Sequence, residues 1–357
     1  MKYLEFEQIE RLNIEINSAC NAACPGCARQ VAGIYRNEVY PKNQHMSLGT
    51  WTKLFYEVGQ QISSVVFCGN YGDAGATNHL PEMLQVAHAM NPDTHYVVVT
   101  NLGLNSPEYW KRLGNCIPKH CLQIQCSIDG LEDTNHLYRR FVRWDKVIKN
   151  LEALSKTSAQ LIWKFIEFDW NSHQIEQARQ LADYYNFHDF IVTPNNQPGM
   201  ENFFSEWRDK LGDDWNNPSS LTPPPFPIPD WRTLDPEQAR LDELALAPEF
   251  DTIECYTQQE KSVHIDWTGA VWPCCWYGGA EYHSQPKLRA AQSMLYPEWW
   301  TNWNNLNHHT LREILNNDFY SHRLMDSLDT KPSPVCAASC GKCGGKFNSI
   351  NTIGKNN

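Results

Sequence analysis

The stretch INSACNAACPGCARQ, residues 16–30, places three cysteines in the spacing C-x3-C-x2-C, at Cys20, Cys24 and Cys27. Thiolates are soft ligands that favour zinc or iron–sulfur clusters, and three in one short loop can hold a single metal centre. Structural zinc sites and simple electron-transfer clusters take four protein ligands. Three thiolates on a four-iron cluster leave one iron open, which is what a catalytic cluster needs. The loop therefore predicts a catalytic iron–sulfur site.

Around this loop, residues 11–194 alternate short apolar runs typical of strands with amphipathic stretches typical of helices. Six strands are expected, at 11–17, 63–69, 95–101, 122–129, 161–168 and 188–194. Helices are expected between them, at 47–59, 79–90, 106–114, 144–156 and 173–186. This α/β pattern predicts a partial (β/α)6 TIM-like barrel with its chemistry at the carboxyl ends of the strands.

The second half of the chain breaks this rhythm. The segment NNPSSLTPPPFPIPDW (216–231) holds six prolines in sixteen residues, which favours an extended linker. We expect a partial barrel at 1–194, a Pro-rich linker at 195–250, a small cysteine-rich domain at 251–345 and a flexible tail at 346–357.

Composition narrows the class of protein. A hydrophobic fraction of 41% supports a globular fold, and a formal charge of −11 argues against general nucleic-acid binding. The first residues are acidic and no long uncharged apolar run follows, so we expect a soluble, cytoplasmic protein without membrane contact. In that compartment the thirteen cysteines favour metal ligation over disulfides. Four of them are expected to pack in the core: Cys68, Cys116, Cys121 and Cys126.

The cysteine loop at the end of the first strand resembles the radical S-adenosylmethionine superfamily. The resemblance implies that Cys20, Cys24 and Cys27 hold a [4Fe–4S] cluster whose open iron binds the amino and carboxylate groups of S-adenosylmethionine. One electron from the cluster would cleave this cofactor to methionine and a 5′-deoxyadenosyl radical, which abstracts a substrate hydrogen atom. The position before the last cysteine, commonly aromatic in the family, is Gly26, which removes a packing contact beside the adenine.

The second expected strand ends in CGNYGDAG (68–75), where glycines let the backbone approach a ligand. In position it resembles the family's glycine-glycine-glutamate-proline motif, with an aspartate in place of the glutamate and without the proline. The resemblance implies that this segment binds S-adenosylmethionine through Gly69, Asn70, Tyr71, Gly72 and Asp73.

Two later strand ends add candidates. Asn101, in TNLG (100–103), is suited to hydrogen bonding with the cofactor or to opening a helix. The segment CSIDGLEDTNHLYRR (126–140) resembles a Ser-x-Asp-Gly segment of peptide-modifying members of the family. This implies that Ser127 contacts the ribose or carboxylate and that Arg139, or alternatively Arg140, pairs with the carboxylate.

In the C-terminal part, thirteen residues separate Cys255 from Gly269, and four more separate Gly269 from Cys274. This resembles the opening of the auxiliary-cluster domain called SPASM, or of its shortened form, twitch. The implied auxiliary [4Fe–4S] ligands are Cys255, Cys274, Cys340 and Cys343, with Cys336 as the main competitor. Cys275 is expected to pack, since adjacent side chains diverge in a strand. A zinc ribbon with the same four ligands is the alternative.

The resemblance implies a radical enzyme that oxidises, crosslinks or otherwise modifies a peptide or protein side chain. A radical dehydrogenase or other modifier of a small molecule is the alternative, favoured by the short segment, residues 1–10, before the first strand. A non-catalytic iron–sulfur or zinc protein is a more distant one. An electron donor such as flavodoxin or ferredoxin is the expected partner.

Overall fold

The structure is a computed structural model that describes residues 2–27, 29–31, 35–36, 43–195, 209, 230–282, 286–296, 301–343 and 346–347. Its contacts divide the chain into two units. The larger comprises Ile14–Phe55 and Ser63–Pro225. The smaller comprises Met1–Asn13, Tyr56–Ile62 and Phe226–Asn357.

The larger unit is built on parallel strands that follow one another in chain order. Neighbouring strands pair in parallel along the series β4 (Ser64–Phe67), β5 (His95–Thr100), β6 (Leu122–Ser127), β7 (Gln160–Glu167) and β8 (Asp189–Pro194). At the end of β1 (Arg11–Ile14), the Ile14 carbonyl accepts a 2.9 Å hydrogen bond from the amide of Cys68, beside β4. All six predicted strands are present, and the partial-barrel prediction is confirmed.

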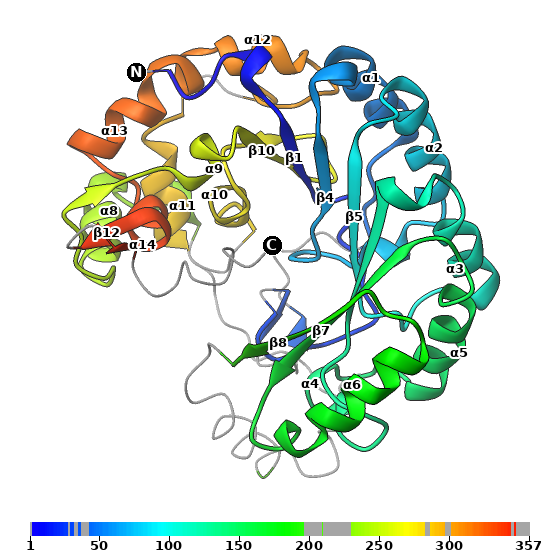
Figure 1. Cartoon of the computed structure of the whole chain (residues 1–357). Helices are drawn as coiled ribbons and strands as arrows, with labels where there is room; N and C mark the ends of the chain where they lie inside the picture. Colours follow the sequence, from blue (N-terminus) through cyan, green and yellow to red (C-terminus); the bar gives the residue numbers. More distant parts are fainter. Residues whose placement is uncertain are drawn as a thin grey trace. The chain divides into compact units, whose positions relative to one another are not determined.

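Helices cover the outer side of these strands (Figure 1). They are α1 (Leu48–Val58), α2 (Leu80–Met90), α3 (Pro107–Gly114), α5 (Trp144–Leu154) and α6 (Ile175–Tyr184), as the apolar spacing predicted. In α1 the side chains of Trp51, Leu54 and Phe55 are at most 1% exposed, because the i, i+3, i+4 spacing turns them to one face. The short elements of the unit are β2 (Gln30–Val31), β3 (Tyr35–Arg36), η3 (Ala74–Ala76), η4 (Lys119–Cys121), α4 (Asn135–Tyr138) and η5 (Ser172–Gln174).

The smaller unit combines short antiparallel strands with short helices. A hairpin joins β10 (Ser262–Ile265) to β11 (Val271–Trp272), and β12 (Gly341–Cys343) pairs with both β9 (Thr252–Ile253) and β13 (Lys346–Phe347). Its longer helices are α8 (Pro236–Leu244), α11 (Pro286–Ser293), α12 (Leu311–Asn316), α13 (Leu324–Thr330) and α14 (Pro334–Cys340). Its shorter helical turns are η1 (Phe6–Gln8), η2 (Gly59–Gln61), η8 (Trp231–Thr233), α9 (Tyr256–Gln259), α10 (Cys275–Gly279) and the π-helical η9 (Phe319–Arg323).

The expected linker contains a helix. Asp235 caps α8 by accepting hydrogen bonds from the amides of Glu237 and Gln238, and Pro236 occupies the first turn, where its missing N–H costs nothing. Residues 236–244, within the predicted linker, are therefore helical, beyond the proline-rich stretch 216–231 for which an extended chain was predicted. Residues 196–208 and 210–229, which hold the proline run up to Pro229, lie outside the described residues.

The predicted tail also begins with structure, since Lys346 and Phe347 pair with β12; residues 348–357 lie outside the described residues. The contact-based units differ from the predicted domains because residues 1–13 and 56–62 group with the C-terminal unit. The predicted boundaries remain a prediction.

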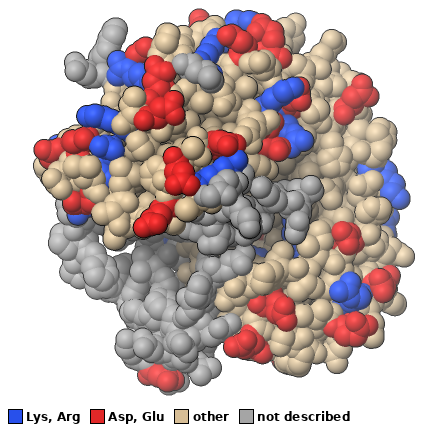
Figure 2. Space-filling view, turned by 60° about the vertical axis from the view of Figure 1, so that its left-hand side comes forward, with Lys and Arg blue, Asp and Glu red and all other residues tan. Residues whose placement is uncertain are grey.

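No described helix is long and apolar enough to cross a membrane. On the face drawn in Figure 2, Lys and Arg side chains lie among Asp and Glu side chains.

Candidate functional site

The cysteine loop follows β1 in the larger unit, as the sequence predicted. Cys24 is buried, while Cys20 and Cys27 are half-buried. The amide of Cys27 donates to the carbonyl of Cys24 at 3.0 Å, which closes a tight turn around Pro25 and Gly26. The turn keeps two of the three thiols close together in one loop.

Each thiol has its own polar neighbour, two of them from distant segments of the unit and one from the loop itself. Asn101 places its Nδ2 atom 3.5 Å from the sulfur of Cys20, and Arg139 places Nη1 3.7 Å from the sulfur of Cys24. The buried Arg29 side chain donates a hydrogen bond to Cys27. One amide and two guanidinium groups thus converge on the three sulfurs, an environment that stabilises negative charge on sulfur.

Burial raises the pKa of two of the three thiols, those of Cys20 and Cys24. Burial raises the pKa of Cys20 to about 12. Burial also raises the pKa of Cys24, and Arg139 opposes that rise. A nucleophilic cysteine needs a lowered pKa, whereas a bound metal removes the thiol proton outright. The site therefore fits a metal cluster better than it fits nucleophilic catalysis.

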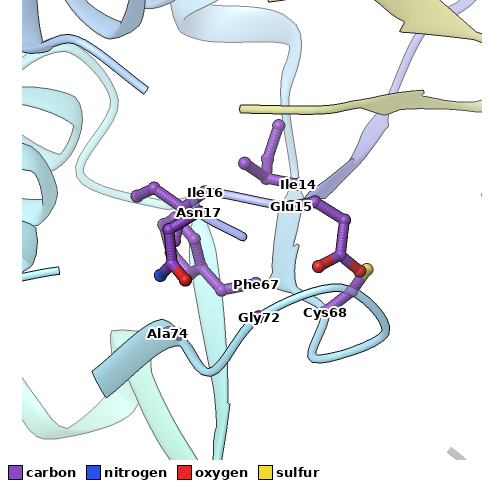
Figure 3. A pocket seen from close by; sticks show the side chains of 8 residues that line it. All are labelled: Ile14, Glu15, Ile16, Asn17, Phe67, Cys68, Gly72 and Ala74. Atoms are coloured by element: carbon purple, nitrogen blue, oxygen red, sulfur yellow. The ribbon is translucent and has the colours of Figure 1, made fainter. Parts of the chain in front are cut away.

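The loop after β4 is anchored by Glu15, an acidic residue that no sequence motif indicated. Glu15, only 2% exposed, accepts hydrogen bonds from the amides of Asn70 at 3.0 Å and Tyr71 at 3.1 Å. Figure 3 shows its side chain directed toward the chain between Cys68 and Gly72. The sequence signal was an acid within an otherwise alternating apolar strand, LNIEIN (12–17).

Gly72 occupies a position where no side chain fits. A Cβ atom there would lie 2.3 Å from both the carbonyl oxygen and the Oδ1 atom of Asn17. Asn17 in turn donates from Nδ2 to the Asp73 carbonyl at 2.9 Å. The pocket at this junction, lined by the residues in Figure 3, does not admit a water molecule. The junction is thus a packed anchor, whereas Gly69, at the start of the loop, is exposed.

Asp73 makes different contacts from those predicted. Its carboxylate accepts hydrogen bonds from the amides of Gly75 and Asn101, both at 2.8 Å, and the side chain is buried. Burial raises its pKa, although these hydrogen bonds oppose the rise. Its own amide donates to Ala19 at 2.7 Å. Asp73 therefore ties the cysteine loop to Asn101, and its contact with the cofactor stays a prediction.

The segment after β6 joins the same site. The Nε atom of Arg139 lies 2.5 Å from Oδ2 of Asp129, whose side chain is fully buried. Burial raises the pKa of Asp129 and Arg139 opposes it. The sequence assigned no role to Asp129, so its role as the counter-charge of Arg139 comes from the structure alone. The neighbouring Gly130 has a φ of +142°, which favours glycine.

The remaining two candidates lie at the edges of this group. Ser127 is half-buried at the end of β6. Arg140, the alternative to Arg139, is buried, and its carbonyl accepts a hydrogen bond from Ala23 in the cysteine loop at 3.1 Å. Arg139 therefore reaches a cysteine sulfur, whereas Arg140 supports the loop backbone.

A second cysteine site lies in the smaller unit. Cys255, Cys274, Cys336 and Cys340 line one pocket together with apolar side chains, among them Ile253, Pro273, Leu324, Leu328 and Val335. They come from three segments of the chain. Cys255 follows β9, Cys274 follows the β10–β11 hairpin, and Cys336 and Cys340 both lie in α14. Four thiols in an apolar shell are the donor set of an iron–sulfur cluster.

This arrangement changes the predicted ligand set. Cys343 is exposed and does not line the pocket, while Cys336, the predicted competitor, does. Cys336 and Cys340 are one helical turn apart on α14, so their side chains share a face, whereas Cys343 has already entered β12. Cys275, expected to pack, is half-buried and also lies outside the pocket lining.

The thiols in the pocket raise the pKa of their neighbours. Burial raises the pKa of Cys340 to about 11, and the neighbouring thiol of Cys255 adds to the rise. Burial likewise raises the pKa of Cys255, Cys274 and Cys336. Within the described residues, no three His, Cys, Asp or Glu side chains converge on a point suited to one metal ion. The four thiols instead surround a space, as ligands of separate irons in one cluster would.

Comparisons with known proteins bear on the fold and on the C-terminal cysteine-rich part of the chain. Residues 255–344 match the SPASM family, described as an iron–sulfur cluster-binding domain. The structure of Streptococcus suis SuiB bound to S-adenosylmethionine matches with a TM-score of 0.56 at 14% identity, covering 94% of this chain and 73% of SuiB. SuiB bound to its precursor peptide SuiA matches with a TM-score of 0.54 at 12% identity, covering 94% and 72%. No curated protein sequence matches significantly.

The structure is thus an α/β partial barrel that carries a three-cysteine loop, together with a separate cysteine-lined pocket. The chain has the fold of SuiB, as the sequence predicted, and its residues 255–344 match the SPASM domain family. The expected cofactor types, iron–sulfur clusters and S-adenosylmethionine, agree with the matched domain and with the ligand of SuiB. The individual ligands remain predictions.

Proposed function

We propose that this chain is a radical S-adenosylmethionine enzyme that acts on a peptide or protein. Cys20, Cys24 and Cys27 would hold the first [4Fe–4S] cluster. Cys255, Cys274, Cys336 and Cys340 would hold the auxiliary one. The observation that carries the proposal is the three-thiol loop in which each sulfur has its own donor, Asn101, Arg139 or Arg29.

When bound, the reduced cluster supplies the electron that cleaves S-adenosylmethionine to methionine and a 5′-deoxyadenosyl radical, which takes a hydrogen atom from the substrate. The residues of the chain prepare this step. Asn101, Arg139 and Arg29 oppose the negative charge of the thiolates, and Glu15 fixes the loop after β4 through the amides of Asn70 and Tyr71. Three thiolates leave one iron for the amino acid end of S-adenosylmethionine.

A peptide substrate is supported by SuiB, which was solved with its precursor peptide SuiA and shares this fold. The auxiliary cluster would accept an electron from the substrate radical, so the net outcome is oxidation or bond formation. A flavodoxin or ferredoxin would supply the electron to the first cluster. The chemistry is thus of the oxidoreductase type.

The first experiment is anaerobic reconstitution with iron and sulfide, followed by dithionite, S-adenosylmethionine and chromatography for 5′-deoxyadenosine. Wild-type protein should form it and Cys24→Ala should not. Cys116→Ala is the matched control, because Cys116 is half-buried and lies outside both cysteine sites. Equal product from wild type and Cys24→Ala would overturn the proposal.

The substrate class is tested with a mixture of short random-sequence peptides. Oxidation or crosslinking removes two hydrogen atoms from a peptide, which mass spectrometry detects. We expect such products and a matching increase in 5′-deoxyadenosine. Unchanged peptides, together with product stimulated by a mixture of small alcohols and sugars, would favour the small-molecule alternative.

A further inference from the structure

Tyr277 lines the auxiliary pocket and carries a hydroxyl that has no partner among the described residues. Its side chain is 0% exposed and lines the pocket with the four cysteines. Among the described residues, nothing forms a hydrogen bond with this hydroxyl. Burying a hydroxyl without a partner costs folding free energy, so such a group needs a physical reason.

Two other buried tyrosines of the same unit show the contrast. The hydroxyl of Tyr3 donates to the Ser262 carbonyl at 2.9 Å, and that of Tyr320 donates to the Val271 carbonyl at 3.0 Å. Both side chains are at most 1% exposed, as is Tyr277. Tyr277 differs from these two tyrosines of its unit because its hydroxyl has no hydrogen-bond partner among the described residues.

Tyr277 is held firmly beside the thiols. Its amide donates to the sulfur of Cys274 at 3.3 Å, and its carbonyl accepts from Nε2 of Gln292 at 3.2 Å. Its ring packs against those of Phe319, at a centroid distance of 5.8 Å, and Trp272, at 6.4 Å. Burial raises the pKa of the phenol, and Cys336, Glu281, Tyr320 and Cys274, in that order, add to the rise.

We propose that the Tyr277 hydroxyl donates a hydrogen bond to a sulfur atom of the auxiliary cluster and thereby raises the reduction potential of that cluster. The inference rests on the proposed function, since it requires a cluster in this pocket. Adding one electron makes the cluster sulfurs more negative, so a donor stabilises the reduced form more than the oxidised form. Tyr277 is thus a positioning and tuning residue, not a catalytic one.

The test isolates the auxiliary cluster. The background is the variant Cys20→Ala/Cys24→Ala/Cys27→Ala, reconstituted anaerobically, to which Tyr277→Phe or Tyr320→Phe is added. Dithionite and redox mediators set the potential, and electron paramagnetic resonance measures the reduced cluster. At the midpoint of the parent, Tyr277→Phe should lower the ratio of reduced to oxidised cluster about fivefold, the effect of one net hydrogen bond. Tyr320→Phe should leave the ratio unchanged.

The experiment distinguishes failure of the proposed auxiliary cluster from failure of the proposed role of Tyr277. A triple-cysteine background that binds no iron would remove the proposed auxiliary cluster itself. A background with about four irons per chain and an unchanged ratio in Tyr277→Phe would overturn the role of Tyr277 alone.

A second readout uses the iron-free protein. Without the cluster, Tyr277→Phe should be at least as stable as its parent, because it deletes an unpaired hydroxyl, whereas Tyr320→Phe should be less stable. A loss of stability in Tyr277→Phe would show that the hydroxyl has a protein partner, and would contradict the inference.

Discussion

Asp129 and Arg139 form a buried ion pair, with 2.5 Å between Oδ2 and Nε, and the same guanidinium lies 3.7 Å from the sulfur of Cys24. Burial works against the charge of Arg139, yet Asp129 and Cys24 together raise its pKa above the ordinary value. Asp129 thereby keeps a positive charge beside the cysteine loop. The pair also joins the end of β6 to the segment after α4.

Replacing Asp129 with Asn should leave Arg139 buried without its counter-charge. We expect the free energy of unfolding to fall by about 3–5 kcal/mol, the usual cost of breaking a buried pair by removing one partner. Anaerobic urea unfolding of the iron-free protein measures it. Asp145→Asn, which breaks the exposed pair with Arg143, is the control and should change nothing measurable. Equal stability of both variants would show that the pair does not act as described.

Gly72→Ala should lower the free energy of unfolding by about 1–3 kcal/mol, because the new methyl group would overlap Asn17 and force the backbone to shift. The same unfolding experiment measures it. Gly59→Ala is the matched control, since a Cβ at Gly59 meets no atom within 4 Å. Indistinguishable variants would mean that the junction between the loop after β4 and Asn17 is loose.

Cys336→Ala and Cys343→Ala should differ in bound iron. In the variant that lacks Cys20, Cys24 and Cys27, losing Cys336 should abolish or strongly reduce the iron bound by the pocket, whereas losing Cys343 should not. Cys336 lines the pocket and Cys343 is exposed outside it. Iron analysis after anaerobic reconstitution decides between them. The reverse result would restore the ligand set expected from the sequence.

His264 should make stability depend on pH. It lies in β10 with 0% exposure, and burial lowers its pKa to about 3. The unfolded chain takes up a proton near pH 6.5, while the folded chain does so only near pH 3. Stability therefore falls as the pH drops through this window, by about 1.4 kcal/mol per pH unit.

Measuring unfolding at pH 6.5 and pH 5.0 checks this dependence. His264→Phe should remove about 2 kcal/mol of the difference between the two conditions. His309→Phe, at an exposed position, should keep the full difference. An unchanged difference in His264→Phe would show that the imidazole is already protonated in the folded protein.

The sequence by itself determined the six strands, the helices between them, the three-cysteine loop and the presence of an auxiliary domain. These follow from local information, since apolar periodicity sets the buried faces and fixed cysteine spacing sets a loop that can wrap one centre. Asn101 was predicted from its place at a strand end, whereas the roles of Arg139 and of the loop from Gly69 to Asp73 were predicted from the resemblance to a known family.

Only the tertiary structure decided which groups face one another. In the sequence, Glu15 is one residue of a strand and Asp129 one residue of a turn. Their roles depend on partners elsewhere in the chain: two backbone amides for Glu15 and the Arg139 guanidinium for Asp129. Cys336 and Cys343 are alike in sequence, but a helical turn directs one into the pocket and a change to strand carries the other to the surface. The physical reason is that burial and pairing are properties of the packed chain, which local spacing does not contain.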